Sequence, residues 1–181
     1  MFRRIMVPYD SSQPADSAVE YSIELAKSIT QSGRVDSCYI ILVHVVPEVP
    51  ATPLLLERPV RTNKGETITL SEYIKQLYEE MVDHAKEMLE KKKKELEAKA
   101  DSKTAVKVVA LVGDSISNKI LELADKEKVD LIVIGNVGLS GISKLKTLGS
   151  VSRAISERAS CPVMIVHASA STKSPSEAPS R

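Results

Sequence analysis

Apolar residues follow two spacings along this chain, and the two spacings alternate. Some form short continuous runs rich in Val and Ile, and others recur every three or four positions between polar residues. The runs are typical of strands buried on both faces of a sheet, and the recurring positions are typical of helices with one buried face. The runs predict strands at 4–9, 35–46, 106–112, 131–134 and 163–167. The recurring positions predict helices at about 12–33, 68–100, 116–127 and 149–158.

The order of these elements predicts an α/β fold. Strands and helices alternate, with one long interruption after the second strand, and such alternation produces a parallel sheet with right-handed crossovers. We predict a single doubly wound, Rossmann-like parallel sheet of five strands in the order 3-2-1-4-5, with helices on both faces. Ligands bind beyond the carboxyl ends of the strands where such an order reverses, here between the first and fourth strands. The segments at that point are 8–10 and 134–135.

Two segments depart from the alternation. Residues 47–65 contain four of the nine prolines, so we predict a long loop there rather than a strand or a helix. Its three consecutive leucines, Leu54 to Leu56, could cover a ligand, pack on a second copy of the chain, or fold onto the core. Residues 168–181 are mainly Ser, Pro, Ala and charged residues and are predicted to be a disordered tail. The remaining residues, 1–167, form one domain.

Length, composition and charge limit the possible functions. The 181 residues suffice for one domain, and 43% hydrophobic with 27% charged residues is the composition of a soluble globular protein. The net charge of +1 argues against a dedicated nucleic-acid-binding protein, which usually carries a basic excess. No apolar run approaches the roughly 20 residues that span a bilayer, so no membrane association is predicted.

The cysteines and the first residues favour a cytoplasmic location. Cys38 and Cys161 form no Cys-x-x-Cys pair, so disulfide bonding is not expected. The first residues lack the long apolar stretch of a signal peptide. No pair among the three histidines has the spacing of metal ligands, so no metal site is predicted.

The segment after the fourth predicted strand is rich in glycine. Four of the seven glycines, Gly135, Gly138, Gly141 and Gly149, lie within fifteen residues. Glycine has no Cβ and lets a ligand approach the backbone, and Ser150 begins a helix whose free N–H groups favour phosphate. The segment is neither a Walker loop nor a dinucleotide fingerprint. It predicts either a phosphate-binding loop or a connection that lets the last helix pack closely.

Several motifs of this chain resemble those of the universal stress protein family. Gly135-Asn136-Val137-Gly138 followed by Gly149-Ser150 is similar to the Gly-x-x-Gly-(nine residues)-Gly-Ser/Thr motif of its ATP-binding members. Pro8-Tyr9-Asp10-Ser11-Ser12 resembles the turn after the family's first strand, His44-Val45-Val46 the end of its second strand, and residues 161–166 its final strand. The resemblance covers residues 2–167 except much of the segment 47–66, and the motifs are specific in this order.

The resemblance implies a regulatory or stress-response protein that binds ATP, with or without Mg²⁺. Asp10 and the Val45 backbone would contact adenine and ribose, and Pro8 would shape the turn. Ile134 and Gly135 would pass under the ribose, and the glycines and the helix start that follow would hold the phosphates. The residues expected to bind the nucleotide are Pro8, Asp10, Ser12, Val45, Ile134, Gly135, Gly138, Gly149, Ser150 and Val151.

The resemblance also implies a homodimer. The last strand of that family commonly pairs with the same strand of a second copy, so Val163–Val166 would form the dimer contact. A bare apolar edge strand favours association on physical grounds as well.

Two features depart from the family pattern. Ten residues separate Gly138 from Gly149 where the motif has nine, and the extra residue either bulges or moves the second glycine away from the phosphates. Tyr9 is bulkier than the residue that usually follows the proline, and it could narrow the adenine slot or stack on the base.

Three functions follow as hypotheses. The first is a nucleotide-binding regulatory dimer, the second an ATP hydrolase or a phospho- or adenylyl-transferase on the same fold, and the third a dimeric scaffold without a nucleotide. The sequence beside the glycine segment offers no convincing general base or arginine clamp, which argues against the enzyme. If the ten-residue spacing moves Gly149 away from the phosphates, the scaffold without a nucleotide is favoured.

Overall fold

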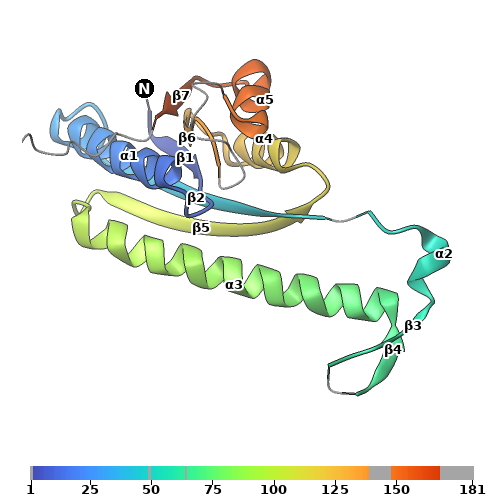
Figure 1. The fold of residues 1–181 in the computed structure, drawn as a ribbon. Helices are drawn as coiled ribbons and strands as arrows, with labels where there is room; N and C mark the ends of the chain where they lie inside the picture. The colour runs from blue at the N-terminus through green and yellow to red at the C-terminus, as the bar shows by residue number, and fades with distance from the viewer. Residues whose placement is uncertain (1, 49, 64, 139–147, 168–181) are drawn as a thin grey trace, which may run out of the picture.

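Five parallel strands form the central sheet of this protein. The computed structural model describes residues 2–48, 50–63, 65–138 and 148–167. The strands are β1 (Arg4–Pro8), β2 (Cys38–Pro47), β5 (Thr104–Gly113), β6 (Leu131–Gly135) and β7 (Val163–Val166). They lie in the order β5-β2-β1-β6-β7, and every neighbouring pair is parallel (Figure 1). This is the order 3-2-1-4-5 in chain order of the five strands, so the predicted fold class is confirmed.

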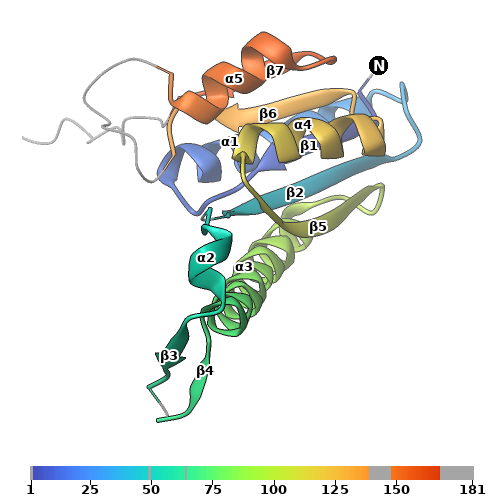
Figure 2. The same ribbon diagram turned by 90° about the vertical axis from the view of Figure 1, so that its right-hand side faces the viewer.

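Two helices cover each face of the sheet (Figure 2). The helices on one face are α1 (Gln13–Gln31) and α3 (Leu70–Lys99), and those on the other are α4 (Ile116–Glu127) and α5 (Ser150–Arg158). Side chains along β1 alternate between the two cores, since Ile5 and Val7 pack with α1 and α3 whereas Met6 packs with α4 and α5. All three are fully buried. The doubly covered sheet therefore explains why its strands appear as continuous apolar runs.

Local caps and strand pairing fix where the elements begin. The Ser12 Oγ accepts a hydrogen bond from the Ala15 N–H at 3.3 Å and so caps α1. Thr69 and Glu72 form a capping box, so α3 begins at Leu70. The second strand begins at Cys38 rather than at residue 35, because its pairing with β5 starts at Cys38 and Thr104, and its pairing with β1 starts one residue later.

The prediction of an unstructured loop after β2 is wrong. The segment contains the short helix α2 (Pro53–Leu56) and a hairpin of β3 (Pro59–Arg61) and β4 (Thr67–Thr69). The prolines are compatible with these elements, because proline suits the first turn of a helix and the first residue of an edge strand. Gly65, with a φ of +84°, supplies the left-handed residue of the hairpin turn.

The first half of α3 extends beyond the sheet, with the hairpin at its far end (Figures 1 and 2). Ala85, Leu89 and Leu96 are buried in the second half of the helix. Leu77 and Met81 precede Ala85 at the same four-residue spacing, yet their side chains are 40% and 45% exposed. The helix predicted at about 68–100 is confirmed, but only the second half of its apolar face is covered by the sheet.

The structure bears only in part on the predicted lack of membrane association and on the predicted cytoplasmic location. Among the described residues, none of the helices is both long enough and apolar enough to cross a membrane. Cys38 and Cys161 are both free, and burial raises the pKa of the Cys38 thiol to about 11. The cytoplasmic location stays a prediction. The predicted tail at 168–181 and Gly141 lie outside the described residues.

Candidate functional site

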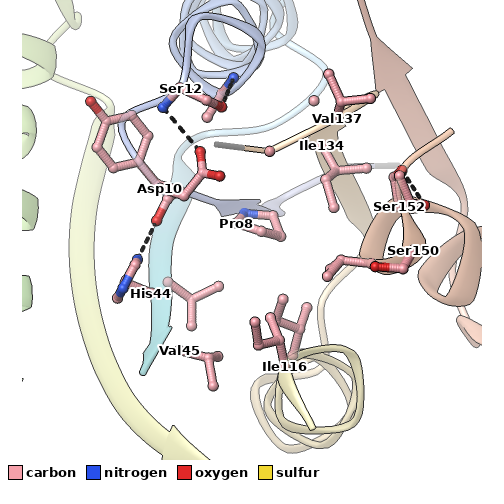
Figure 3. Close-up of a pocket in the computed structure, with 18 of the residues that line it drawn as sticks. Pro8, Asp10, Ser12, His44, Val45, Ile116, Ile134, Val137, Ser150 and Ser152 are labelled. Carbon is pink, nitrogen blue, oxygen red and sulfur yellow. Dashed lines mark hydrogen bonds between the residues drawn. The ribbon is translucent and has the colours of Figure 1, made fainter. Parts of the chain in front are cut away.

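A cavity of about 520 Å³ lies at the carboxyl ends of β1 and β6, where the strand order reverses (Figure 3). This volume is within the range of small-molecule sites. All ten residues predicted to bind a nucleotide line this one cavity, and their role in binding stays a prediction. Tyr9, His44 and Val137 also line the cavity and belong to the motifs quoted above. The sequence did not indicate the remaining lining residues, which are Ala15, Val43, Pro47, Ile116, Ile120 and Ser152.

One part of the cavity wall is apolar. Val45 comes from the end of β2, Ile134 from β6, and Ile116 and Ile120 from the first turns of α4. Ile120 and Ile134 are buried, with 2% and 5% of their surfaces exposed. Figure 3 shows Val45 and Ile116 on the side of the cavity away from Asp10 and Ser12. A flat apolar group such as a nucleobase fits between such side chains.

The turn from β1 to α1 supplies the carboxylate of the cavity. Asp10 accepts a hydrogen bond from the Ser12 N–H at 3.0 Å, and Ser11 between them has a left-handed φ of +62°. An Asp that bonds the backbone two residues onward stabilises this kind of turn. This short-range bond stabilises the turn and places the Asp10 carboxylate at the cavity.

Tyr9 is held from several directions. Its N–H donates to the Val43 carbonyl at 2.8 Å, and its own carbonyl accepts from His44 Nδ1 at 2.8 Å. A carbonyl only accepts, so the neutral imidazole carries its proton on Nδ1. The Tyr9 hydroxyl donates to Asp16 at 2.9 Å, and Lys92 Nζ lies 5.5 Å from the ring centre. The ring is therefore anchored in the core under α1 and α3, which argues against its stacking on a bound base.

This anchoring changes the acidity of the groups involved. Burial and the hydrogen bond to Asp16 raise the pKa of the Tyr9 hydroxyl to about 12, although the nearby Lys92 opposes the rise. Burial alone would lower the pKa of Lys92, but hydrogen bonds with Glu95 and Asp16 raise it overall. Lys92 lies 2.9 Å from Asp16 and 2.7 Å from Glu95. Tyr9 is therefore neutral and Lys92 charged throughout the physiological pH range.

The start of α5 is tied to the end of β6. The Gly149 N–H donates to the Asn136 carbonyl at 2.8 Å. The buried Ser152 Oγ lies 2.7 Å from the same carbonyl and 3.0 Å from the Gly149 carbonyl, so it shares its proton between them. The longer spacing before Gly149 therefore leaves this glycine beside β6, in the same cavity as Gly138. Residues 139–147, nine of the ten residues between Gly138 and Gly149, lie outside the described part of the chain.

The glycines of the site differ in what a side chain at each position would contact. A Cβ on Gly135 would lie 2.7 Å from Pro14 Cβ and 2.8 Å from the Pro14 carbonyl carbon, so this glycine allows α1 to pack against β6. A Cβ on Gly138 would instead lie 2.6 Å from Asp10 Oδ2, inside the cavity. On Gly149 it would lie 3.4 Å from the Asn136 carbonyl oxygen. Gly135 therefore serves the packing of the first helix, whereas the connection hypothesis concerned the last helix, α5. Gly138 leaves room beside Asp10, and a Cβ at Gly149 would make only ordinary contacts.

The start of α5 is suited to an anion. The helix runs for nine residues from Ser150, and both Ser150 and Val151 line the cavity. The first N–H groups of a helix have no partner within the helix and carry the positive end of its dipole. Asp10 is the one acidic side chain among the described lining residues. Within the described chain, no group of three or more His, Cys, Asp or Glu side chains is placed to hold a metal ion.

The sequence model of the universal stress protein family matches residues 1–167. The chain belongs to the universal stress protein family. Universal stress protein MJ0531 of Methanocaldococcus jannaschii is 28% identical over 167 residues, which are 92% of this chain and 82% of that protein. The solved structure of MJ0577 from the same organism superposes with a TM-score of 0.70 at 26% identity, over 92% of this chain and 96% of the other.

Two solved universal stress proteins of the same fold contain adenine nucleotides. One is in complex with cAMP, with 23% identity and a TM-score of 0.53, over 93% of this chain and 98% of the other. The second, from Arabidopsis thaliana, has AMP bound, with 20% identity and a TM-score of 0.53, over 96% of both chains. At these identities the likeness to this universal stress protein is one of fold.

Proposed function

We propose that this universal stress protein binds an adenine nucleotide, with ATP as the expected ligand, in the cavity between β1 and β6. The observation that carries the proposal is the cavity itself. It joins an apolar wall, at Val45 and Ile116, to the glycines and the helix start at Gly138, Gly149 and Ser150. A nucleotide has the same two parts, an aromatic base and an anionic phosphate chain.

The residues of the cavity suggest an orientation for the ligand. The base would lie between Val45 and the isoleucines, where burial of its faces is favourable. The Asp10 carboxylate would accept hydrogen bonds from ribose hydroxyls, since an ionised carboxylate only accepts. The phosphates would bind at the first N–H groups of α5 and the Ser150 hydroxyl, where a helix start supplies donors without arginine. Asp10 is also the group that a Mg²⁺ bound to the phosphates would approach through water.

The two nucleotide complexes of the family support the adenine part of this proposal. Both AMP and cAMP contain adenosine and a phosphate, as ATP does. The triphosphate is our inference from the resemblance of Gly138, Gly149 and Ser150 to the motif of ATP-binding members, and all three residues line the cavity. Binding would make the cavity a sensor of the nucleotide supply in a stress-response protein.

A homodimer through β7 is part of the same proposal. β7 pairs only with β6 among the described strands, so Val163–Val166 is an edge strand, and Met164 is 39% exposed. An apolar edge invites pairing with another strand. Pairing with the same strand of a second copy would satisfy both edges at once.

The proposal is tested by identifying any nucleotide that copurifies with the protein. Denaturation followed by mass spectrometry is expected to release ATP or ADP from the parent protein, and none from Gly149→Val/Ser150→Ala. Ser156→Ala is the matched control, because Ser156 lies on the exposed side of the same helix. Calorimetric titration with ATP, AMP and cAMP then ranks the ligands, and phosphate release measures any hydrolysis. An empty parent protein whose melting temperature is unchanged by all three nucleotides would contradict the proposal and favour the scaffold.

A further inference from the structure

One lysine of α3 packs against the turn that leads into the cavity. The side chain of Lys92 is 19% exposed, and its Nζ lies 2.9 Å from Asp16 Oδ1 and 5.5 Å from the centre of the Tyr9 ring. A second carboxylate, that of Glu95, lies 2.7 Å from the same Nζ. A lysine withdraws from water only where its charge is paired, so these contacts determine the position of the ammonium group.

The two residues of the first turn that Lys92 contacts lie on either side of the turn in the sequence. Tyr9 precedes Asp10 and Ser12, which line the cavity, and Asp16 follows them in the first turn of α1. The Tyr9 hydroxyl donates to the same Asp16 oxygen that Lys92 approaches, at 2.9 Å in each case. One side chain of α3 therefore contacts both ends of the segment that carries the cavity carboxylate.

The helix α3 itself lies outside the cavity. None of the described residues that line the cavity belongs to 70–99, so any effect of Lys92 on a ligand there is indirect. Among the described residues two ion pairs join α3 to α1, Lys92 with Asp16 and Lys99 with Glu20 at 3.8 Å. Lys99 and Glu20 are 61% and 67% exposed, and exposed pairs stabilise little. Lys99 is also about 10 Å further along the helix than Lys92.

We propose that Lys92 is a positioning residue of the nucleotide site, which holds the turn of Asp10 in place through its contacts with Tyr9 and Asp16. The inference rests on the nucleotide binding proposed above. Without the ammonium group Asp16 would lose one of its donors and the Tyr9 ring its cation, and the turn would be free to move at the cavity. The bulky Tyr9, which departs from the family pattern, thus attaches the first turn to α3.

The same contacts make α3 responsive to the ligand. When a contact strengthens the binding of a ligand, the bound ligand strengthens that contact by the same factor. A nucleotide that bonds to Asp10 would fix the turn, so that Tyr9 and Asp16 hold Lys92 more firmly. Bound nucleotide is therefore expected to slow the local opening of α3 around Lys92, although no described residue of this helix lines the cavity.

The test compares substitutions at the two lysines that join α3 to α1. Lys92→Met keeps an apolar side chain of similar length without the charge, and we expect the dissociation constant for ATP, measured by calorimetry, to rise at least about fivefold. Lys92→Arg restores a cation and is expected to bind ATP as the parent does. Lys99→Met is the matched control, because it breaks the pair with Glu20 and should leave the affinity unchanged. Melting curves without nucleotide check that all three variants stay folded.

Hydrogen exchange gives a second readout, which in the parent needs no substitution. ATP is expected to slow exchange at the amides of residues 88–96 in the parent chain, and this protection should be lost in Lys92→Met at saturating ATP. Equal affinity in Lys92→Met and the parent, or an equal loss in Lys92→Met and Lys99→Met, would overturn the inference and leave the proposed function intact. Exchange at residues 88–96 that ATP leaves unchanged would overturn it as well. A parent chain that binds no nucleotide would overturn both proposals.

Discussion

Gly138 lies so close to Asp10 that a Cβ at position 138 would stand 2.6 Å from the Asp10 carboxylate oxygen Oδ2. The two residues are far apart in the sequence, and they meet because β1 and β6 are neighbours with their carboxyl ends at the same edge. A carboxylate and an open stretch of backbone thus face one cavity. This pairing gives the site its polar side, opposite the apolar wall formed by β2 and α4.

Alanine substitutions at Gly138 and Gly135 are expected to have different effects. In Gly138→Ala the new methyl meets only the end of the Asp10 side chain, which can rotate away, so the fold should be retained. Asp10 then leaves its position at the ligand, and we expect affinity for ATP to fall about tenfold, which corresponds to about 1.4 kcal/mol. Calorimetric titration measures the change. Unchanged affinity would show that Asp10 and Gly138 do not contact the nucleotide.

Gly135→Ala is the contrasting variant. Its methyl meets the backbone of Pro14 as well as the ring, and backbone cannot rotate away. We expect a loss of about 1–3 kcal/mol in the free energy of unfolding, as in other overpacked cores. Urea denaturation measures it. A variant as stable as the parent would mean that α1 can shift without cost, and that Gly135 is needed for the ligand instead.

Ser152→Ala tests the attachment of α5 to β6. The substitution removes the proton shared between the Asn136 and Gly149 carbonyls, although the Gly149 N–H still bonds to Asn136. We expect a loss of about 1 kcal/mol in stability, the net value of one buried hydrogen bond, and weaker nucleotide binding because the helix start is less firmly placed. Ser156→Ala, on the exposed side of α5, serves as the control for both readouts.

Tyr9→Phe tests the anchoring of the first turn through its pH dependence. The pKa of Tyr9 is raised to about 12 in the folded protein from 10.0, so between these values the folded chain holds a proton that the unfolded chain has lost. The stabilisation by Tyr9 is therefore complete below pH 10 and disappears as the pH rises toward 12. The difference in unfolding free energy between the parent and Tyr9→Phe should be larger at pH 8 than at pH 11. A difference that is the same at both pH values would contradict the role of the hydroxyl, and Tyr21→Phe controls for an exposed tyrosine.

His44→Ala removes the donor to the Tyr9 carbonyl. Without it the turn that carries Asp10 loses one of its links to β2, and we expect a loss of about 1 kcal/mol in stability together with weaker ATP binding. His84→Ala is the control, since His84 is exposed on α3. Equal stability and affinity in the two variants would show that the Tyr9 backbone bond to Val43 holds the turn alone.

Much of the fold and of the candidate site could be predicted from the sequence, because both depend on local patterns. Apolar runs identify buried strands, and the rules for crossovers then leave few possible orders of the sheet. The order placed 8–10 and 134–135 together, and the structure has them at one cavity. The glycines after β6 and the start of α5 were equally visible, since glycine and serine at such positions have strong local preferences.

Contacts between distant segments were decided only by the tertiary structure. The sequence could not distinguish Gly135, which makes room for Pro14, from Gly138, which faces Asp10, because a missing Cβ does not reveal what approaches it. The bonds of His44 to Tyr9 and of Ser152 to Asn136 join residues on different elements and have no local pattern. In the same way the periodicity of α3 predicted an apolar face along the whole helix, but not that the sheet ends beneath its middle. The spacing of apolar residues in the sequence predicts that one face of a helix is apolar, whereas only the tertiary structure shows what packs against that face.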